Sequence, residues 1–143
     1  MIYISHRGYT NGIEHDVENN PKEIQKLINQ NINVEIDVRF FNNQLYLGHD
    51  EPKYKIDKEF LLNNKLWCHA KDFQALDLLS KINCHYFWHQ NDNYTITSRG
   101  YIWVYPGKPL FKNSICVLPE AYNQDFSMCY GVCTDYINRY IKF

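Results

Sequence analysis

Residues 34–40, Val-Glu-Ile-Asp-Val-Arg-Phe, decide how this chain folds. Their aliphatic and charged side chains alternate, which predicts a strand with one aliphatic face and one face that carries Glu35, Asp37 and Arg39. A parallel strand between two others seldom turns carboxylates toward water, because both faces of a parallel sheet are normally covered. The two carboxylates are therefore expected at an enclosed functional site. The alternative is the solvated face of an edge strand.

Strands and helices alternate on both sides of this stretch. Helices are predicted where aliphatic side chains recur at helical spacing, and strands where apolar residues alternate with polar ones. Asn20 is expected to cap the first long helix, because Pro21 follows it at a position that suits a first helical turn. The predicted helices are residues 21–31, 59–64, 72–82 and 136–143, and the predicted strands are residues 2–8, 34–40, 66–71, 84–90, 94–98, 101–106, 114–120 and 131–137.

The order strand, helix, strand, helix, strand in the first half requires right-handed crossovers, which wind strands into an open sheet or a closed barrel. Polar residues cluster at the C-terminal ends of successive strands, where a (β/α)₈ barrel builds its active site. A doubly wound sheet has its site at one crevice instead. We therefore expect an α/β fold, a minimal TIM-type (β/α)₈ barrel with most helices of the second half missing. The polar strand ends are His6, Arg7, Glu35, Asp37, His69, Lys71, His89, Glu120 and Asp135.

Composition excludes several classes of protein. The 143 residues carry a net charge of −1, too little to hold nucleic acid or a membrane surface by bulk charge. No segment approaches the roughly 20 apolar residues that span a bilayer, and the N-terminus lacks a signal-peptide pattern. The five cysteines form no Cys-x-x-Cys pair, which predicts reduced, buried thiols in a cytoplasmic protein. One domain is expected over residues 1–143.

The residues with candidate chemistry form a recurring pattern. Glu35 and Asp37 are two residues apart on a strand, so they share a face and can bind one hard cation. His69 and Lys71 repeat this spacing on the next predicted strand. One imidazole lies at the end of the first strand, and a second follows a loop of the right length to fold back over that cation. The full set is His6-Arg7-Gly8, Glu18-Asn19, Glu35-x-Asp37, Gly48-His49-Asp50 and His69-x-Lys71.

In this order the motifs resemble the glycerophosphodiester phosphodiesterase family and, more broadly, the phospholipase C-like phosphodiesterase superfamily, which includes sphingomyelinase D-type phospholipases. The resemblance covers residues 2–72 and resumes weakly at residues 131–137. It implies a barrel fold and a metal-dependent phosphodiesterase. The family barrel is far longer than this chain, so loops that usually select the substrate are absent.

The resemblance implies a role for each matching residue. His6 and His49 would be the catalytic acid–base pair, and Arg7 and Lys71 would bind phosphate oxygens. Mg²⁺ or Ca²⁺ would be held by carboxylates. Where the family has a third acidic ligand, this chain has a histidine, which favours Mn²⁺, Co²⁺ or Zn²⁺. The implied metal ligands are Glu35, Asp37 and His69, with Glu18 as a further candidate.

Elementary chemistry agrees with these roles. In phosphodiester cleavage the attacking hydroxyl loses a proton and the leaving alkoxide gains one, and two imidazoles can do both near neutral pH. A divalent ion and two cationic side chains neutralise the charge that develops on phosphate oxygens. We expect a small-molecule phosphodiester as substrate.

Several alternatives remain open from the sequence. The attacking group is water or a neighbouring substrate hydroxyl, and the latter would make the protein a lyase that releases a cyclic phosphate from a lysophospholipid-like substrate. A non-catalytic barrel that binds a phosphate ligand is a third reading. His69 is either a metal ligand or a packed strand histidine. A second copy of the chain is one expected cover for the helix-poor half, with a homodimer slightly favoured; tyrosine-rich loops or residues 136–143 are the others.

Overall fold

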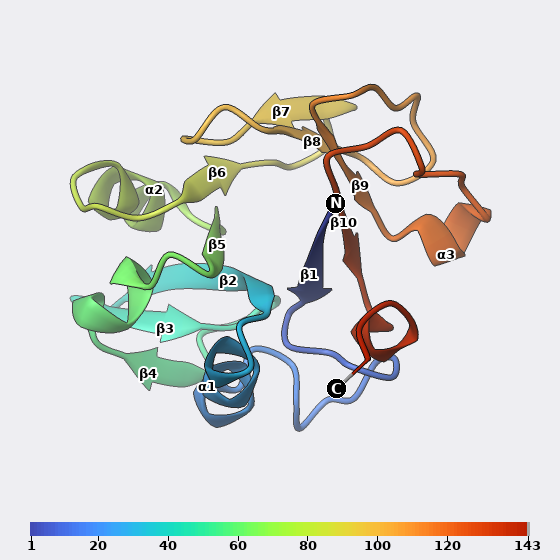
Figure 1. The fold of residues 1–143 in the computed structure, drawn as a ribbon. Coiled ribbons are helices and arrows are strands. Elements are labelled where there is room, and N and C mark those ends of the chain that lie inside the picture. The colour runs from blue at the N-terminus through green and yellow to red at the C-terminus, as the bar shows by residue number, and fades with distance from the viewer. Residues whose placement is uncertain (143) are drawn as a thin grey trace.

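The computed structural model describes residues 1–142, where one curled sheet of ten strands carries the fold (Figure 1). The strands are β1 (Ile2–His6), β2 (Asn33–Phe41), β3 (Gln44–Leu47), β4 (Tyr54–Ile56), β5 (Leu66–Ala70), β6 (Tyr86–Trp88), β7 (Tyr94–Ile96), β8 (Ile102–Val104), β9 (Ser114–Val117) and β10 (Gly131–Thr134). The helices are α1 (Pro21–Asn29), α2 (Phe73–Ser80) and α3 (Pro119–Tyr122), with 3₁₀ turns η1 (Lys58–Leu62) and η2 (Ile137–Arg139). Phe143, which ends the predicted helical piece 136–143, lies outside the described residues.

Parallel strands form most of the sheet. They lie side by side in the order β6-β5-β2-β1-β10-β9-β8, and β7 pairs antiparallel with β8 at the far end. Each strand predicted from the sequence is present. Helices α1 and α2 make the expected crossovers from β1 to β2 and from β5 to β6, because parallel neighbours cannot be joined by a tight turn.

The predicted TIM-type (β/α)₈ barrel is nevertheless wrong. The sheet is mixed and curls into a half-barrel, and residues 1–142 contain three α-helices instead of a helix after every strand. In this part of the chain no ladder joins β6 to β7; isolated hydrogen bonds, such as Ser98 N to Tyr86 O at 2.8 Å, span the gap. The physical reason is the length of the connections. Residues 97–101 are too few for a crossover, so the chain reverses between β7 and β8.

A hairpin that the sequence prediction omitted extends β2. β3 pairs antiparallel with the second half of β2, and β4 pairs antiparallel with β3. The turn between β2 and β3 is Asn42-Asn43, whose φ angles of 49° and 58° lie in the left-handed region that asparagine tolerates. β2 therefore has different neighbours along its length, which shapes the site described below.

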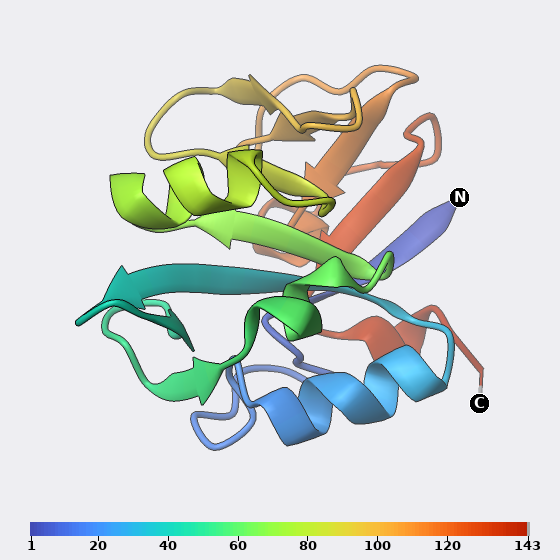
Figure 2. The same cartoon turned by 90° about the vertical axis from the view of Figure 1, so that its left-hand side faces the viewer.

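Helices α1 and α2 cover the outer face of β2 and β5 (Figures 1 and 2). Asn20 caps α1 as predicted, since its side chain accepts a hydrogen bond from Lys22 N at 3.0 Å. The Asp72 side chain caps α2 in the same way, by accepting from Ala75 N at 2.8 Å. This outer layer packs aliphatic side chains from both helices against Val34, Ile36, Val38, Leu66, Cys68 and Ala70.

Different kinds of side chain cover the two faces of the sheet. The inner, concave face is filled at one end by an aromatic-rich cluster of Ile4, Trp67, Phe87, Trp103, Ile115, Val117 and Cys133. On the outer face of β9 and β10, residues from the C-terminal half supply part of the cover. Tyr140 stacks on Tyr3 with ring centroids 5.6 Å apart, and Phe126 packs edge-on against Tyr140. The segment around Phe126 and the residues after η2 thus cover part of this face.

The cysteines follow the sequence prediction. Each of the five is buried as a free thiol. Among the described residues, no helix has the length and apolar character needed to cross a bilayer.

Candidate active site

Strand β2 changes partner along one edge at Asp37. β1 pairs with β2 up to the position where His6 lies opposite Glu35, and β3 pairs with β2 only beyond Asp37. Local groups therefore satisfy the backbone of Asp37: its N–H donates to Asn19 Oδ1 at 2.9 Å, and its carbonyl accepts from Gly48 N at 3.1 Å. These bonds draw the loop after β1 and the loop after β3 toward the site.

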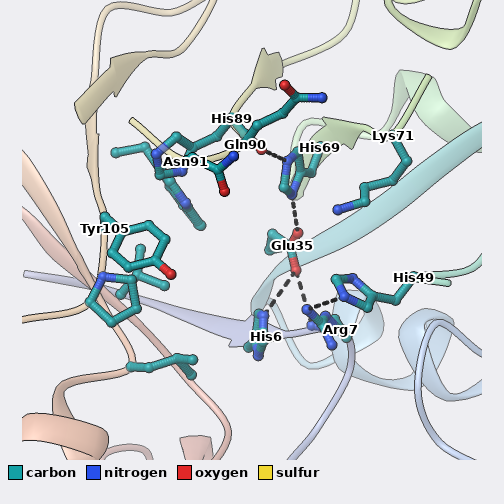
Figure 3. Close-up of a pocket in the computed structure, with 14 residues that line it drawn as sticks. His6, Arg7, Glu35, His49, His69, Lys71, His89, Gln90, Asn91 and Tyr105 are labelled. Carbon is teal, nitrogen blue, oxygen red and sulfur yellow. Dashed lines mark hydrogen bonds and ion pairs between the residues drawn. The ribbon is translucent and has the colours of Figure 1, made fainter. Parts of the chain in front are cut away.

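Strand register places the candidate ligands on the inner face. His6 lies opposite Glu35, and Asp37 lies opposite His69 on β5. Residues two apart on a strand share a face, so the two carboxylates of β2 point the same way. In the close-up, Glu35 lies at the centre with His6 on one side and His69 on the other (Figure 3).

Glu35, Asp37 and His69 form a cluster with the composition of a metal site. His69 Nδ1 lies 3.5 Å from Glu35 Oε1 and 3.6 Å from Asp37 Oδ1, and one donor atom from each residue falls within 4.8 Å of the others. Among residues 1–142, Asp37 Oδ1 is buried and has no hydrogen-bond partner. An orphaned carboxylate oxygen beside two further donors fits a divalent ion.

The second oxygen of Asp37 is held by three neighbours. Asp37 Oδ2 accepts from Asn19 Nδ2 at 2.9 Å and lies 3.2 Å from Arg7 Nε and 3.4 Å from His49 Nδ1. Burial raises the pKa of Asp37, but His49, Arg7, His69 and Asn19 outweigh burial and hold that pKa well below its usual range. Asp37 is therefore an anion at neutral pH, as a metal ligand requires.

His6 is oriented by a carboxylate that directly follows the last strand of the sheet, β10. Its Nδ1 lies 2.6 Å from Asp135 Oδ1, while Nε2 faces the site, 3.9 Å from Glu35 Oε2. A carboxylate partner fixes the proton on Nδ1, so the Nε2 lone pair points into the site. Asp135 is itself held, because its backbone N–H donates to Glu120 Oε1 at 2.9 Å.

His49 is carried by the loop that begins at Gly48. Arg39, on β2, donates from Nε to Gly48 O at 2.9 Å and from Nη2 to His49 O. These bonds fix the backbone of the loop, and the His49 ring lies on the rim with Nε2 at 3.4 Å from Arg7 Nη2. The structure thus brings both predicted imidazoles to one site.

The two predicted phosphate-binding residues also reach the site. Lys71 Nζ lies 4.0 Å from Asp37 Oδ1, and Arg7 Nη1 lies 3.7 Å from Glu18 Oε2. Burial lowers the pKa of Arg7, but Asp37, Glu35 and Glu18 outweigh burial and raise it above its usual value. Glu18 accepts a hydrogen bond from Tyr9 and contacts Arg7, and it lies outside the metal-type cluster.

All seven predicted site residues belong to one corner of the fold, and six of them line a cavity of about 580 Å³. Asp37 is fully buried beneath it. The opposite wall is neutral and partly aromatic, with Tyr105 half-exposed and Trp103 in the core. The lining residues are His6, Arg7, Glu35, His49, His69, Lys71, His89, Gln90, Asn91, Trp103, Tyr105, Pro106, Val117 and Leu118.

Sequence reasoning missed the partners that hold the site together. Asn19 was noted only beside Glu18, and its bidentate contact with Asp37 depends on the divergence of β1 and β3. Asp135 was noted as a polar strand end, but it meets His6 from the far end of the chain. The signal for Asp135 was its position as a polar residue at the C-terminal end of a predicted strand.

Comparison with known proteins gave no further assignment. No protein-family model, curated protein or solved structure matched the chain. The resemblance to phosphodiesterases therefore rests on the motifs in the sequence.

Proposed function

We propose that this protein is a metal-dependent phosphodiesterase that hydrolyses small glycerophosphodiester-type substrates with two histidines as acid and base. One observation carries the proposal: two imidazoles, two cationic side chains and a carboxylate–imidazole cluster meet around one cavity. These residues are His6, His49, Arg7, Lys71, Glu35, Asp37 and His69.

The cationic side chains would bind the anionic phosphate. Arg7 and Lys71 approach the same carboxylate, Asp37, from different elements, and both line the cavity. A phosphodiester placed between them would have its non-bridging oxygens next to two positive charges. Such prepositioned charges stabilise a transition state in which negative charge builds up on those oxygens.

The two imidazoles would move the protons. His6 presents a free Nε2 lone pair, because Asp135 engages its Nδ1, so His6 suits the role of base toward an attacking water. As the new P–O bond forms and the P–O bond to the leaving alcohol breaks, His49 would donate a proton to the leaving oxygen. The oxygen of the attacking water is then bonded to phosphorus, and the products are a phosphomonoester and an alcohol.

Glu35, Asp37 and His69 would hold the metal ion. When bound, a divalent ion supplies Lewis-acid charge beside the phosphate oxygens. Asp37 is prepared for this role by its ionised state and its orphaned Oδ1. The resemblance alone would imply Mg²⁺ or Ca²⁺, and the imidazole of His69 adds Mn²⁺ as a candidate.

The proposal is tested by turnover of bis(p-nitrophenyl) phosphate and glycerophosphocholine, with and without EDTA. We expect turnover that EDTA abolishes and an added divalent ion restores. His15→Ala serves as a control, because His15 is exposed and lies outside the cavity. Turnover that resists EDTA, or binding of a diester without turnover under any divalent ion, would contradict the proposal.

A further inference from the structure

We propose that the cluster binds a divalent ion of borderline hardness, Mn²⁺, Co²⁺ or Zn²⁺, in preference to Mg²⁺ or Ca²⁺, and that His69 ligates it through Nδ1. The inference rests on the metal site of the proposed function and specifies its donor atoms and the class of metal. Four observations on His69 and Asp37 carry it.

The first observation fixes the tautomer of His69. Its Nε2 lies 2.8 Å from the backbone carbonyl of His89. A carbonyl oxygen can only accept a hydrogen bond, so Nε2 must carry the proton. In a neutral imidazole the lone pair is then on Nδ1. A ligating histidine typically donates its other ring N–H to a carbonyl or carboxylate in this way.

The second observation is where that lone pair points. Nδ1 faces two carboxylate oxygens, Glu35 Oε1 and Asp37 Oδ1, at 3.5 and 3.6 Å. Three lone-pair donor atoms, one nitrogen and two oxygens, therefore converge on one point. A cation bound between them removes the mutual repulsion and uses all three lone pairs.

The third observation is that the ring cannot readily turn away. His69 stacks on Phe87 with ring centroids 4.8 Å apart and an interplanar angle of 18°, and its side chain is 15% exposed. Phe87 belongs to the buried cluster on the inner face. Packing on one face and the carbonyl at Nε2 together preorganise Nδ1 for ligation.

The fourth observation is the orphaned oxygen. Asp37 Oδ1 is buried and, within the described chain, has no hydrogen-bond partner, so an unsatisfied acceptor points at the same place as the imidazole. Two carboxylates and one imidazole make a mixed N/O donor set. Imidazole nitrogen favours first-row transition metals and Zn²⁺ over Mg²⁺ and Ca²⁺, which prefer oxygen.

The geometry also connects the metal to the neutral wall of the cavity. The carbonyl that holds His69 belongs to residue 89, and Gln90 and Asn91 follow it along that wall. Figure 3 shows this contact between His69 and the segment that leads to Gln90 and Asn91. Ion binding should therefore shift the backbone amide signals of residues 89–91.

Calorimetric titration of the metal-free protein tests the choice of metal. We expect Mn²⁺ and Co²⁺ to bind at least about tenfold more tightly than Mg²⁺, because an imidazole donor favours them. In His69→Glu this ratio should fall about tenfold. His69→Gln should weaken Co²⁺ binding by at least about 10- to 100-fold, the loss that is typical when even an outer partner of a ligand is removed. His15→Gln is the matched control. A ratio that is unchanged in His69→Glu overturns the inference.

The donor atom is tested in the wild-type chain, so the result does not depend on a variant that folds. Protein labelled with ¹⁵N at histidine is titrated with ¹¹³Cd²⁺, and scalar coupling to the ring nitrogens is recorded. Coupling to Nδ1 of His69 is expected. Coupling to Nε2, or no coupling to His69, overturns the inference. Neither readout uses a substrate, so absent turnover would contradict the proposed function and leave the metal assignment standing.

Discussion

At the scale of single residues, the site depends on side chains that hold other side chains. Asp135 orients His6, Asn19 holds Asp37, and the carbonyl of His89 orients His69. A histidine in a sequence is a candidate acid, base, ligand or packing residue, and its partner decides among these roles. Those partners come from distant parts of the chain, so the pattern of residues predicts the candidates but not their tautomers.

Replacing His6 or its carboxylate partner should distinguish the general base from the residue that orients it. We expect His6→Ala to lower kcat by about 10²-fold or more, the usual contribution of a general base. Asp135→Asn should lower kcat by a smaller factor and shift the pH–rate profile, because the imidazole loses its charged partner. The exposed Asp77→Asn is the control. A normal kcat in His6→Ala, measured by initial rates, would remove His6 from the mechanism.

His85 provides a test that is independent of activity. It is buried against Trp67 and bonded to Thr97, and burial, with the charge of Arg99 second, lowers its pKa to about 4. Because the pKa of His85 in the unfolded chain is about 6.5, the folded state binds fewer protons than the unfolded state below that pH. Above pH 6.5 His85 is neutral in both states and costs no stability. The unfolding free energy should therefore fall by up to about 2 kcal/mol between pH 6.5 and 4.

Urea denaturation at several pH values measures this effect. His85→Gln should flatten the pH dependence between pH 6.5 and 4, even where the variant is less stable overall. His15→Gln should leave the dependence unchanged, since His15 is exposed. An identical slope in the wild type and His85→Gln would contradict the assigned pKa.

At the scale of elements, local sequence patterns predicted where strands and helices lie but not how the strands connect. Alternation located every strand from β1 to β10 except β3 and β4, and apolar spacing with Asn20 located α1. The missed hairpin depends on two asparagines with positive φ, which resemble an ordinary polar turn in a sequence. The predicted barrel failed because the direction of β7 follows from its short link to β8, a relation that strand patterns do not contain.

The loop that carries His49 should be sensitive to its first residue. A Cβ added at Gly48 would lie 1.8 Å from the backbone carbonyl oxygen of Glu51, so the loop must move. We expect Gly48→Ala to lower kcat at least about tenfold through displacement of His49, since small misplacements of catalytic groups are costly.

Gly100 offers a matched control for this substitution. It has φ +85° and open space around it, so Gly100→Ala should cost about 1 kcal/mol of stability from backbone strain and leave turnover intact. Kinetics and urea denaturation of both variants separate the effects. Unchanged kcat in Gly48→Ala would show that the loop does not position His49.

At the scale of the whole molecule, the chain uses few helices to enclose a curled sheet. The outer face near β1, β9 and β10 is covered in part by Tyr140 and Phe126. Tyr140→Ala should lower the unfolding free energy by about 1–2 kcal/mol, because it removes the stack on Tyr3 and opens the cluster beneath. Tyr122→Ala, on an exposed residue, should change it little. Equal stabilities of the two variants would show that Tyr140 does not cover this face.

The central claim is that the metal-type cluster and the histidines act together on a phosphodiester. The most direct measurement is ³¹P NMR of a glycerophosphodiester incubated with metal-free protein, with protein reconstituted with Mn²⁺, and with reconstituted His49→Ala. The account predicts a phosphomonoester signal only with the reconstituted wild type, and no cyclic phosphate signal. Conversion by the metal-free protein, or accumulation of a cyclic phosphate, would contradict it.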